Sequence, residues 1–245
     1  GAMAGLSAAC LARDGFTGSP ALVVEDPAVA DLWADLGERW RILELYFKPH
    51  PVCRWAQPAI EASLNLRAEH GVSPDDIAQI EIETFHNAVR LDQYRPKSTE
   101  EAQYSLPFPV AAALVHGHLP PSAILENALD DPAVLAVSDR IRLLEADDIE
   151  ARFPAERFAR ARFRMKDGRV LESATTPARG DAERPLGDHE IVSKFQRIAG
   201  SLCGRELSEA ILASIAGLER EETVDGLVNL LVAPLEEPGE GKNVA

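Results

Sequence analysis

The stretch Lys48-Pro49-His50-Pro51-Val52-Cys53-Arg54 constrains the fold most, because two prolines restrict its backbone within seven residues. A residue that precedes a proline is driven out of the helical region, so Lys48 and His50 are expected to be extended or in a turn. The chain then becomes helical, because Pro58 suits a first helical turn and an apolar face follows over 58–70. Cationic and thiol side chains therefore lie on a restricted loop that leads into a helix.

This loop has two interpretations. The backbone amides and the dipole at a helix N-terminus attract anions. With Lys48, His50 and Arg54 nearby, the pattern indicates an anion-binding site that also handles protons. The same pattern is equally typical of an ordinary loop that is held by a structural pair of prolines.

The charge balance limits the partners of the chain. It has 25 basic and 40 acidic residues, for a net charge of −15. Nucleic acid is not expected as a partner, because phosphate binding needs a basic surface, and an anionic membrane surface is disfavoured for the same reason. A small anionic substrate remains compatible with this charge, since a few cations in a pocket outweigh a distant, screened field.

The sequence carries no signal for membrane insertion or metal binding. No run approaches the roughly 18 apolar residues of a membrane-spanning helix, and no signal peptide is recognised. The cysteines Cys10, Cys53 and Cys203 are far apart and form no Cys-x-x-Cys pair, which indicates a reducing compartment and predicts a cytoplasmic location. The six histidines form no metal-binding motif, so no metal is expected.

The two ends of the chain read as helical. Helices are expected over 4–13, from Asp26-Pro27 to about 37, and over 189–200, 206–217 and 223–231, with a short strand over 41–47. Asp26 and Asp188 are expected to cap helices, and Ile191, Val192, Phe195 and Ile198 to face inward. The tail 234–245 is rich in Glu, Pro and Gly and is expected to be disordered.

The centre of the chain mixes strands and helices. Alternating apolar and polar residues predict a strand over 77–85 and a hairpin that joins 159–165 to 170–174 through an Asp-Gly turn. A further strand is expected over 140–145, and helices over 58–70, 109–117, 122–129 and 131–137. The predicted fold class is therefore α+β, with all-helical portions flanking a smaller α+β domain.

Four segments resemble the MmgE/PrpD family and follow the family's order. They are the helix that ends in Gly15-Phe16-Thr17-Gly18, the pattern K-x-x-P-x-C-R-x-x-x-P-A-I-x-A over 48–62, the segment 102–114 with Tyr104-Ser105-Leu106-Pro107, and the helix 190–195 that ends in Lys194-Phe195. The family includes 2-methylcitrate dehydratase, cis-aconitate decarboxylase and iminodisuccinate epimerase.

The resemblance implies a discontinuous helical domain with a smaller α+β domain inserted into it. Residues 1–45 would end the helical domain, 46–185 would form the α+β domain, and 186–233 would return to the helical domain. Family members carry a long helical portion ahead of the first motif, so the chain resembles their C-terminal part. A missing N-terminal helical half and a homodimer are the partners that this resemblance implies.

The resemblance also implies a lyase or isomerase that acts on a small di- or tricarboxylate without a cofactor. The family's reactions move a proton at a carbon next to a carboxylate, or remove CO2 from one. Fixed cations and a tuned acid or base are suited to such chemistry. The alternative is a non-catalytic fragment or subunit that binds a partner helical domain.

Three residues are candidates for catalysis. Lys48 matches the family's signature lysine and is expected to meet a carboxylate, the alternative being a surface lysine in an ion pair. Cys53 stands where relatives carry Cys, His or an acid, so it either moves a proton or lines the pocket. His86, at the end of a predicted strand, falls near the family's pocket lining and otherwise has a structural role.

Four residues are candidates for substrate binding. Arg54 is expected to clamp a carboxylate or to be a structural residue at a helix start. His50 shares the loop and either joins the site or supports it. Tyr104 and Ser105 match the family's aromatic-serine pair, and their hydroxyls either hold a carboxylate or pack in the core.

Other polar positions are given structural roles. Gln57 stands where some relatives have histidine, which disfavours a decarboxylase. Lys194 matches the lysine of the family's C-terminal helix and is expected to be structural or to form an interface. His116, His118 and His189 are expected to be structural.

Overall fold

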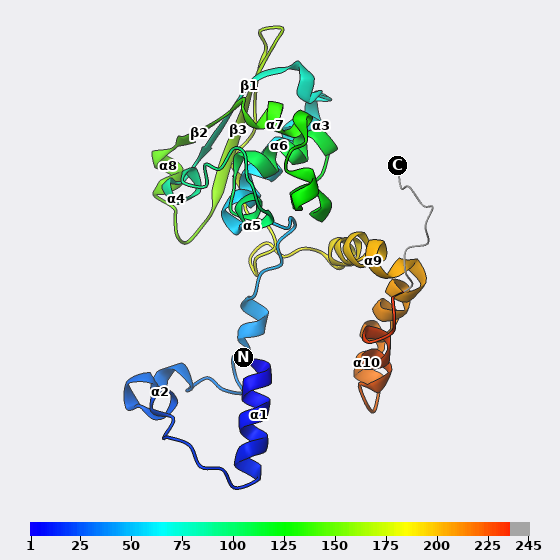
Figure 1. Ribbon diagram of the computed structural model, residues 1–245. Coiled ribbons are helices and arrows are strands. Elements are labelled where there is room, and N and C mark those ends of the chain that lie inside the picture. The colour runs from blue at the N-terminus through cyan, green and yellow to red at the C-terminus, as the bar shows by residue number, and fades with distance from the viewer. Residues whose placement is uncertain (236–245) are drawn as a thin grey trace. The chain divides into compact units, whose positions relative to one another are not determined.

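The fold is organised around a five-stranded sheet with the order β2–β1–β3–β4, in which β5 also pairs with β3. The strands are β1 (Ile77–Thr84), β2 (Ile141–Glu145), β3 (Phe158–Met165), β4 (Val170–Glu172) and β5 (Thr176–Pro177). β2 runs parallel to β1, and the other pairings are antiparallel. The computed structural model describes residues 1–235 (Figure 1) and confirms the predicted α+β fold class.

The inner strand β1 has the alternation that the sequence predicts, although both of its faces are covered. Ile80 and Ile82 are fully buried on the apolar face. On the other face, Glu81 is only 7% exposed because Arg162 and Arg164 of β3 lie over it. Burial alone would raise the pKa of Glu81, but the hydrogen bonds and charges of these two guanidinium groups outweigh it and hold that pKa below its usual value.

Helices cover one face of the sheet. α3 (Gln57–His70) packs on β3, and α6 (Pro107–His116) packs on α3 and on α7 (Pro132–Ser138). The side chains of α6 are buried from Pro107 through Leu114, since its run of alanines lets neighbouring backbones approach closely. One apolar core therefore lies between these helices and the sheet.

Short helical turns connect these elements. They are η3 (Arg54–Ala56), η4 (Pro74–Asp76), α4 (His86–Val89), α5 (Thr99–Gln103), η5 (Pro121–Ile124), η6 (Glu126–Ala128) and α8 (Asp147–Glu150). The predicted helix over 122–129 is therefore wrong: η5 and η6 are separate 3-10 turns, divided at Leu125, whose backbone is extended.

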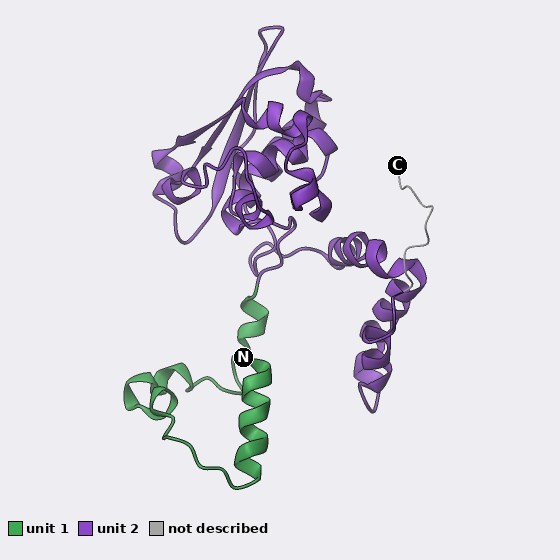
Figure 2. Cartoon of the chain, viewed as in Figure 1, with its two compact units in different colours: residues 1–45 green, residues 46–245 purple. Residues whose placement is uncertain are grey.

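Residues 1–45 form a compact unit of their own, and the described residues from Tyr46 onward form the second (Figure 2). The first unit contains α1 (Ala2–Arg13), α2 (Leu22–Glu25), η1 (Pro27–Leu32) and η2 (Arg41–Glu44). Asp26 caps as predicted, its Oδ1 accepting from Ala28 N at 2.8 Å, but the helix is a 3-10 turn that ends at Leu32. The predicted strand over 41–47 is wrong, because 41–44 form another 3-10 turn.

The C-terminal described segment is helical, as predicted, with different boundaries. α9 spans Asp188–Gly217 and is broken at Gly204, whose φ is +75°. It is followed by η7 (Leu218–Arg220) and α10 (Asp225–Leu231). The N-cap is Gly187 instead of Asp188, and Glu190 Oε2 accepts from the Gly187 amide at 3.0 Å.

The predicted inward face of α9 is only partly covered. Val192 and Ile198 are each 37% exposed, while Ile191 and Phe195 are half-buried. Disorder was predicted for the tail 234–245. Residues 236–245 of this tail lie outside the residues that the structure describes. The proposed subdivision at residues 45, 185 and 233, with an inserted domain, stays a prediction. Within residues 1–235, no helix has both the length and the apolar character that a membrane crossing requires.

The buried aromatic ring of Phe163 gives a test of the core. It is fully buried on β3, opposite Ile80 of β1. Phe163→Ala is expected to lower the free energy of unfolding by about 3–5 kcal/mol, because it leaves a cavity in the core. The matched control is Val170→Ala, which alters a 48% exposed side chain and should change that energy by at most about 0.5 kcal/mol. Urea denaturation followed by circular dichroism measures both, and equal effects would contradict this account of the core.

Candidate functional site

The side chain of Gln57, in the first turn of α3, holds the site loop (residues 46–54) through hydrogen bonds to the loop backbone. The Gln57 side chain is fully buried. Its Oε1 accepts from the His50 amide at 3.0 Å, and its Nε2 donates to the carbonyls of His50 at 3.0 Å and Val52 at 3.1 Å. The loop is therefore fixed by a side-chain amide as well as by its two prolines.

The start of the site loop is anchored on the segment after β5. The Phe47 amide donates to the Gly180 carbonyl at 2.9 Å. Gly180 has φ +90°, and a Cβ atom built there would lie 1.9 Å from the Phe47 carbonyl oxygen. Only glycine allows this close approach, so the anchor depends on the absence of a side chain.

Arg54 already holds a carboxylate, that of Asp181 in the same segment. Its guanidinium also stacks on the ring of Tyr46, with 4.1 Å between the guanidinium carbon and the ring centroid. Burial and the nearby charge of Arg54 lower the pKa of Arg157. The predicted carboxylate clamp therefore has an internal partner, and its geometry serves to close the loop.

A cavity of about 270 Å³ lies beside the site loop and is named here the His50 cavity. Its ionisable lining includes His50, Glu61, Arg179, Glu190, Lys194 and Arg197. These residues come from the loop, α3, the segment after β5 and α9. The folded chain thus gathers charges from positions far apart in the sequence.

A buried imidazole–carboxylate pair forms one wall of the His50 cavity. His50 Nε2 lies 3.0 Å from Glu61 Oε1, and the two side chains are 12% and 13% exposed. Arg179 adds a second layer, with Nη2 at 2.5 Å from Glu190 Oε1 and Nη1 at 3.9 Å from Glu61 Oε2. Both acids of the cavity therefore already have partners.

Three cations stand close together around Lys194. Its ammonium donates to the Lys48 carbonyl oxygen at 2.6 Å. Burial first, and then the charges of Lys48 and Arg197, lower the pKa of Lys194. In the part of the chain that the structure describes, no carboxylate forms an ion pair with Lys48, Lys194 or Arg197. An anion placed among them would relieve their repulsion.

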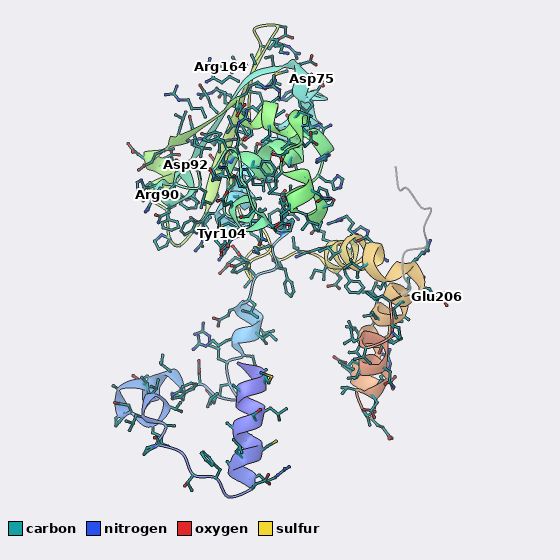
Figure 3. The ribbon with its side chains drawn as sticks, in the orientation of Figure 1. Asp75, Arg90, Asp92, Tyr104, Arg164 and Glu206 are labelled. Atoms are coloured by element: carbon teal, nitrogen blue, oxygen red, sulfur yellow. The ribbon has the colours of Figure 1, made fainter. Side chains whose placement is uncertain are left out.

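The remaining candidates lie elsewhere in the second unit. The Cys53 amide donates to the Gln103 carbonyl at 2.8 Å, which brings Cys53 beside the segment of Tyr104. Tyr104 is 62% exposed and lies at the opposite end of the sheet-bearing part from Arg164 (Figure 3). Ser105 is buried, and its hydroxyl donates to the Gln93 carbonyl at 2.6 Å and accepts from the Phe108 amide at 3.1 Å. Ser105 thus has a structural role in this conformation.

His86 follows β1, as predicted, but its ring has a surface partner. Its Nδ1 lies 2.9 Å from Glu145 Oε2 at the end of β2, and the histidine side chain is 55% exposed. The Trp55 ring beside the site loop meets the Phe85 ring edge-on, at 6.1 Å between centroids. His86 therefore lies near the loop's end, although none of the described contacts joins it to Lys48 or Cys53.

The structure brings Lys48 and His50 together with residues that the sequence reasoning missed. Glu61 and Arg197 were not singled out, Lys194 was expected to be structural or to form an interface, and His118 was given a structural role. One signal was available: Glu61 follows Gln57 by four positions in a helix, which places both on the face that meets the loop. A second signal was the spacing of Arg197, which follows Lys194 by three positions in a predicted helix. Arg179 had no such signal, because it reaches the cavity only through tertiary packing. Within residues 1–235, no group of three or more His, Cys, Asp or Glu side chains is placed to hold a metal ion.

These features define an α+β domain with a cation-rich cavity, fixed beside a proline-bounded loop. Residues 50–220 match the family model of the MmgE/PrpD C-terminal domain. This match takes in most of the chain, which therefore belongs to the MmgE/PrpD family, as its sequence motifs indicate.

Three relatives show how far the similarity extends. The chain is 24% identical to a cis-aconitate decarboxylase-like protein of Aspergillus oryzae, over 94% of the chain and 53% of that protein. It is 22% identical to cis-aconitate decarboxylase of Aspergillus terreus, over 84% of the chain and 44% of the relative. It is 26% identical to mitochondrial 2-methylcitrate dehydratase of Yarrowia lipolytica, over 69% of the chain and 36% of the relative. The chain thus spans about half the length of these relatives, or less.

The Gln57 side chain gives a test of how the loop is held. Gln57→Leu keeps the volume but leaves the His50 amide and two carbonyls without partners, so the free energy of unfolding should fall by about 2–4 kcal/mol. The control is Gln196→Leu at an exposed position of α9, which should leave that energy nearly unchanged. Chemical denaturation measures both variants. A Gln57→Leu protein as stable as the parent would mean that the prolines alone fix the loop.

Proposed function

We propose that this chain takes part in a lyase or isomerase reaction on a small di- or tricarboxylate. The observation that carries the proposal is the group Lys48, Lys194 and Arg197, whose charges have no acidic partner among the described residues. Family membership supports the same reaction class, because relatives are named a decarboxylase and a dehydratase. An acidic protein that keeps unpaired cations together beside a cavity has a place for a small anion.

In this proposal, Lys48 binds a carboxylate of the substrate and stabilises the charge that develops on it. Removing a proton from the neighbouring carbon places negative charge on carboxylate oxygens, and a fixed ammonium lowers the energy of that state. Cys53 or His86 would move the proton. Cys53 is half-buried on the site loop, whereas His86 would first have to leave Glu145.

Arg54 and Tyr104 would assist in binding. Arg54 would exchange its internal partner Asp181 for a substrate carboxylate, because a guanidinium binds either with the same geometry. The exposed Tyr104 hydroxyl has room to donate to a ligand. We further propose a cytoplasmic homodimer that works without a cofactor. The three cysteines are free, which fits a reducing compartment.

A second candidate function is that of a subunit that binds a partner helical domain. Residues 1–45 have no buried residue, and large apolar side chains of this unit are exposed, among them Leu6, Phe16, Trp40 and Leu43. Apolar surface of this extent is typical of interaction sites. A helical partner, in the same enzyme or in a second chain, would cover it and complete the domain that the family resemblance implies.

Lys48 is the first residue to test. Lys48→Ala is introduced into the protein in its source organism, and the variant is purified from there. Its turnover of cis-aconitate or 2-methylcitrate is expected to fall by about a hundredfold or more, since a cation that stabilises the transition state is lost. The folded state should persist, as shown by circular dichroism and thermal melting. Lys166→Ala, in the turn after β3, is the matched control and should retain full activity. Full turnover by the Lys48 variant would remove Lys48 from the mechanism.

The partner-binding alternative makes a different prediction. The chain alone should self-associate as its concentration rises, because burying exposed apolar side chains lowers the free energy of the system. The double variant Trp40→Ser, Leu43→Ser should weaken that association, whereas Val170→Ser on β4 should not. Sedimentation velocity measures it. A chain that stays monomeric at all accessible concentrations would count against this alternative.

A further inference from the structure

We propose that the His50 cavity is the site that receives a carboxylate group of a small organic acid, with Lys194 and Arg197 as its anion ligands and the His50–Glu61 pair on the opposite wall. The proposal rests on the proposed function for the class of ligand. It adds the location of the site and three ligands, Lys194, Arg197 and His50, that act together.

The two cations lie on one face of α9. Lys194 and Arg197 are three positions apart in a helix, a spacing that places them side by side. One N–H of the Lys194 ammonium is used by the Lys48 carbonyl, and its other two can donate to a ligand. Arg197 has no hydrogen-bond or ion-pair partner among the described side chains, so its whole guanidinium fork can receive an oxyanion.

The acids of the cavity do not neutralise these cations. Glu61 is held by His50, and Glu190 is held by Arg179 and by the Gly187 amide. Three basic side chains, Arg179, Lys194 and Arg197, therefore face two carboxylates, which leaves an excess of one positive charge. The cavity therefore favours an anion.

The shape of the site favours an organic acid over an inorganic anion. A volume of about 270 Å³ lies just below the range that is typical of drug-sized ligands, so a small acid is the natural size. An adjoining cavity of about 170 Å³ shares Lys194 and Arg197 and is lined by Pro49, Pro51, Pro120 and Pro121. The cations would hold the carboxylate, and the proline-lined space would receive hydrocarbon.

The site is held in place from both sides. Gln57 fixes the His50 backbone, and the Lys194 ammonium ties α9 to the Lys48 carbonyl. The loop backbone and the Lys194 side chain are therefore positioned before any anion arrives. Such preorganisation lowers the entropy cost of binding.

Direct binding to the full chain tests the proposal independently of turnover. Tricarballylate, a tricarboxylate without a hydroxyl or a double bond, is titrated into the protein at low ionic strength by isothermal calorimetry. Inorganic phosphate is titrated in parallel. Tricarballylate should bind with measurable affinity and phosphate more weakly. Equal affinity for both would indicate a general anion site and overturn the assignment to organic acids.

Removal of the cations should abolish this binding. Arg197→Gln should weaken tricarballylate binding by about tenfold or more, because a charge-assisted hydrogen bond is lost. The double variant with Lys194→Gln should weaken it further. The matched control replaces Arg205 and Arg220, which lie on α9 and η7 outside the cavity lining, with Gln and should bind normally. Arg197→Gln breaks no described contact, so the test survives if the double variant fails to fold.

A substitution of His50 tests its role on the opposite wall. His50→Gln should weaken tricarballylate binding at constant pH, because the imidazole that lines the cavity is lost. His118→Gln, at the other histidine of the lining, is the matched control and should retain most of the binding. Unchanged binding by His50→Gln would exclude His50 as a ligand.

The outcomes separate this proposal from the proposed function. Normal binding by the Arg197 variant, or no binding by the parent chain, would overturn the cavity assignment while leaving the activity of the source enzyme open to its own test. Binding that needs Arg197, in a protein without turnover of any di- or tricarboxylate, would support the cavity and contradict the lyase or isomerase reaction.

Discussion

The buried side-chain amide of Gln57 fixes the backbone on which the site is built, by accepting one hydrogen bond from the site loop and donating three to it. These bonds satisfy the amide and carbonyl of His50 and the carbonyl of Val52, groups that the proline-rich loop cannot pair within itself. The direction of His50 follows from this arrangement, and with it the contact to Glu61 one helical turn further along α3. The Gly180 anchor completes the support by holding the other end of the loop.

Electrostatics divides this domain into two kinds of surface. On the sheet face opposite the helices, the three arginines of β3 meet four acids, Glu81, Glu83, Asp148 and Glu172, so that no positive charge is left over. Around Lys194, the cations outnumber their acidic partners. In a chain with 40 acidic and 25 basic residues, such a local excess of positive charge stands out. This contrast between the two surfaces is the main support for the proposed site.

Much of the sheet could be predicted from local patterns, whereas the site could be predicted only in part. Alternation in β1 and β3, together with an Asp-Gly turn, suffices to identify these strands, because each strand carries its own periodicity. The predictions for 41–47 and 122–129 are wrong because short apolar or mixed runs carry no period. Tertiary packing then decides between a strand, a helix and a 3-10 turn. The same limit hides Arg179, whose role depends on the path of the chain after β5.

The break at Gly204 has a mechanical consequence for the cation-bearing helix. A continuous helix of 30 residues would be a stiff rod of about 45 Å, and a push at its far end would be transmitted to Lys194. With a φ of +75°, Gly204 interrupts this rod ten residues after Lys194. A contact made by the second half of α9, or by α10, thus need not move the first half of α9. Lys194 and Arg197 thus belong to a helical segment that ends at Gly204, whatever the second half contacts.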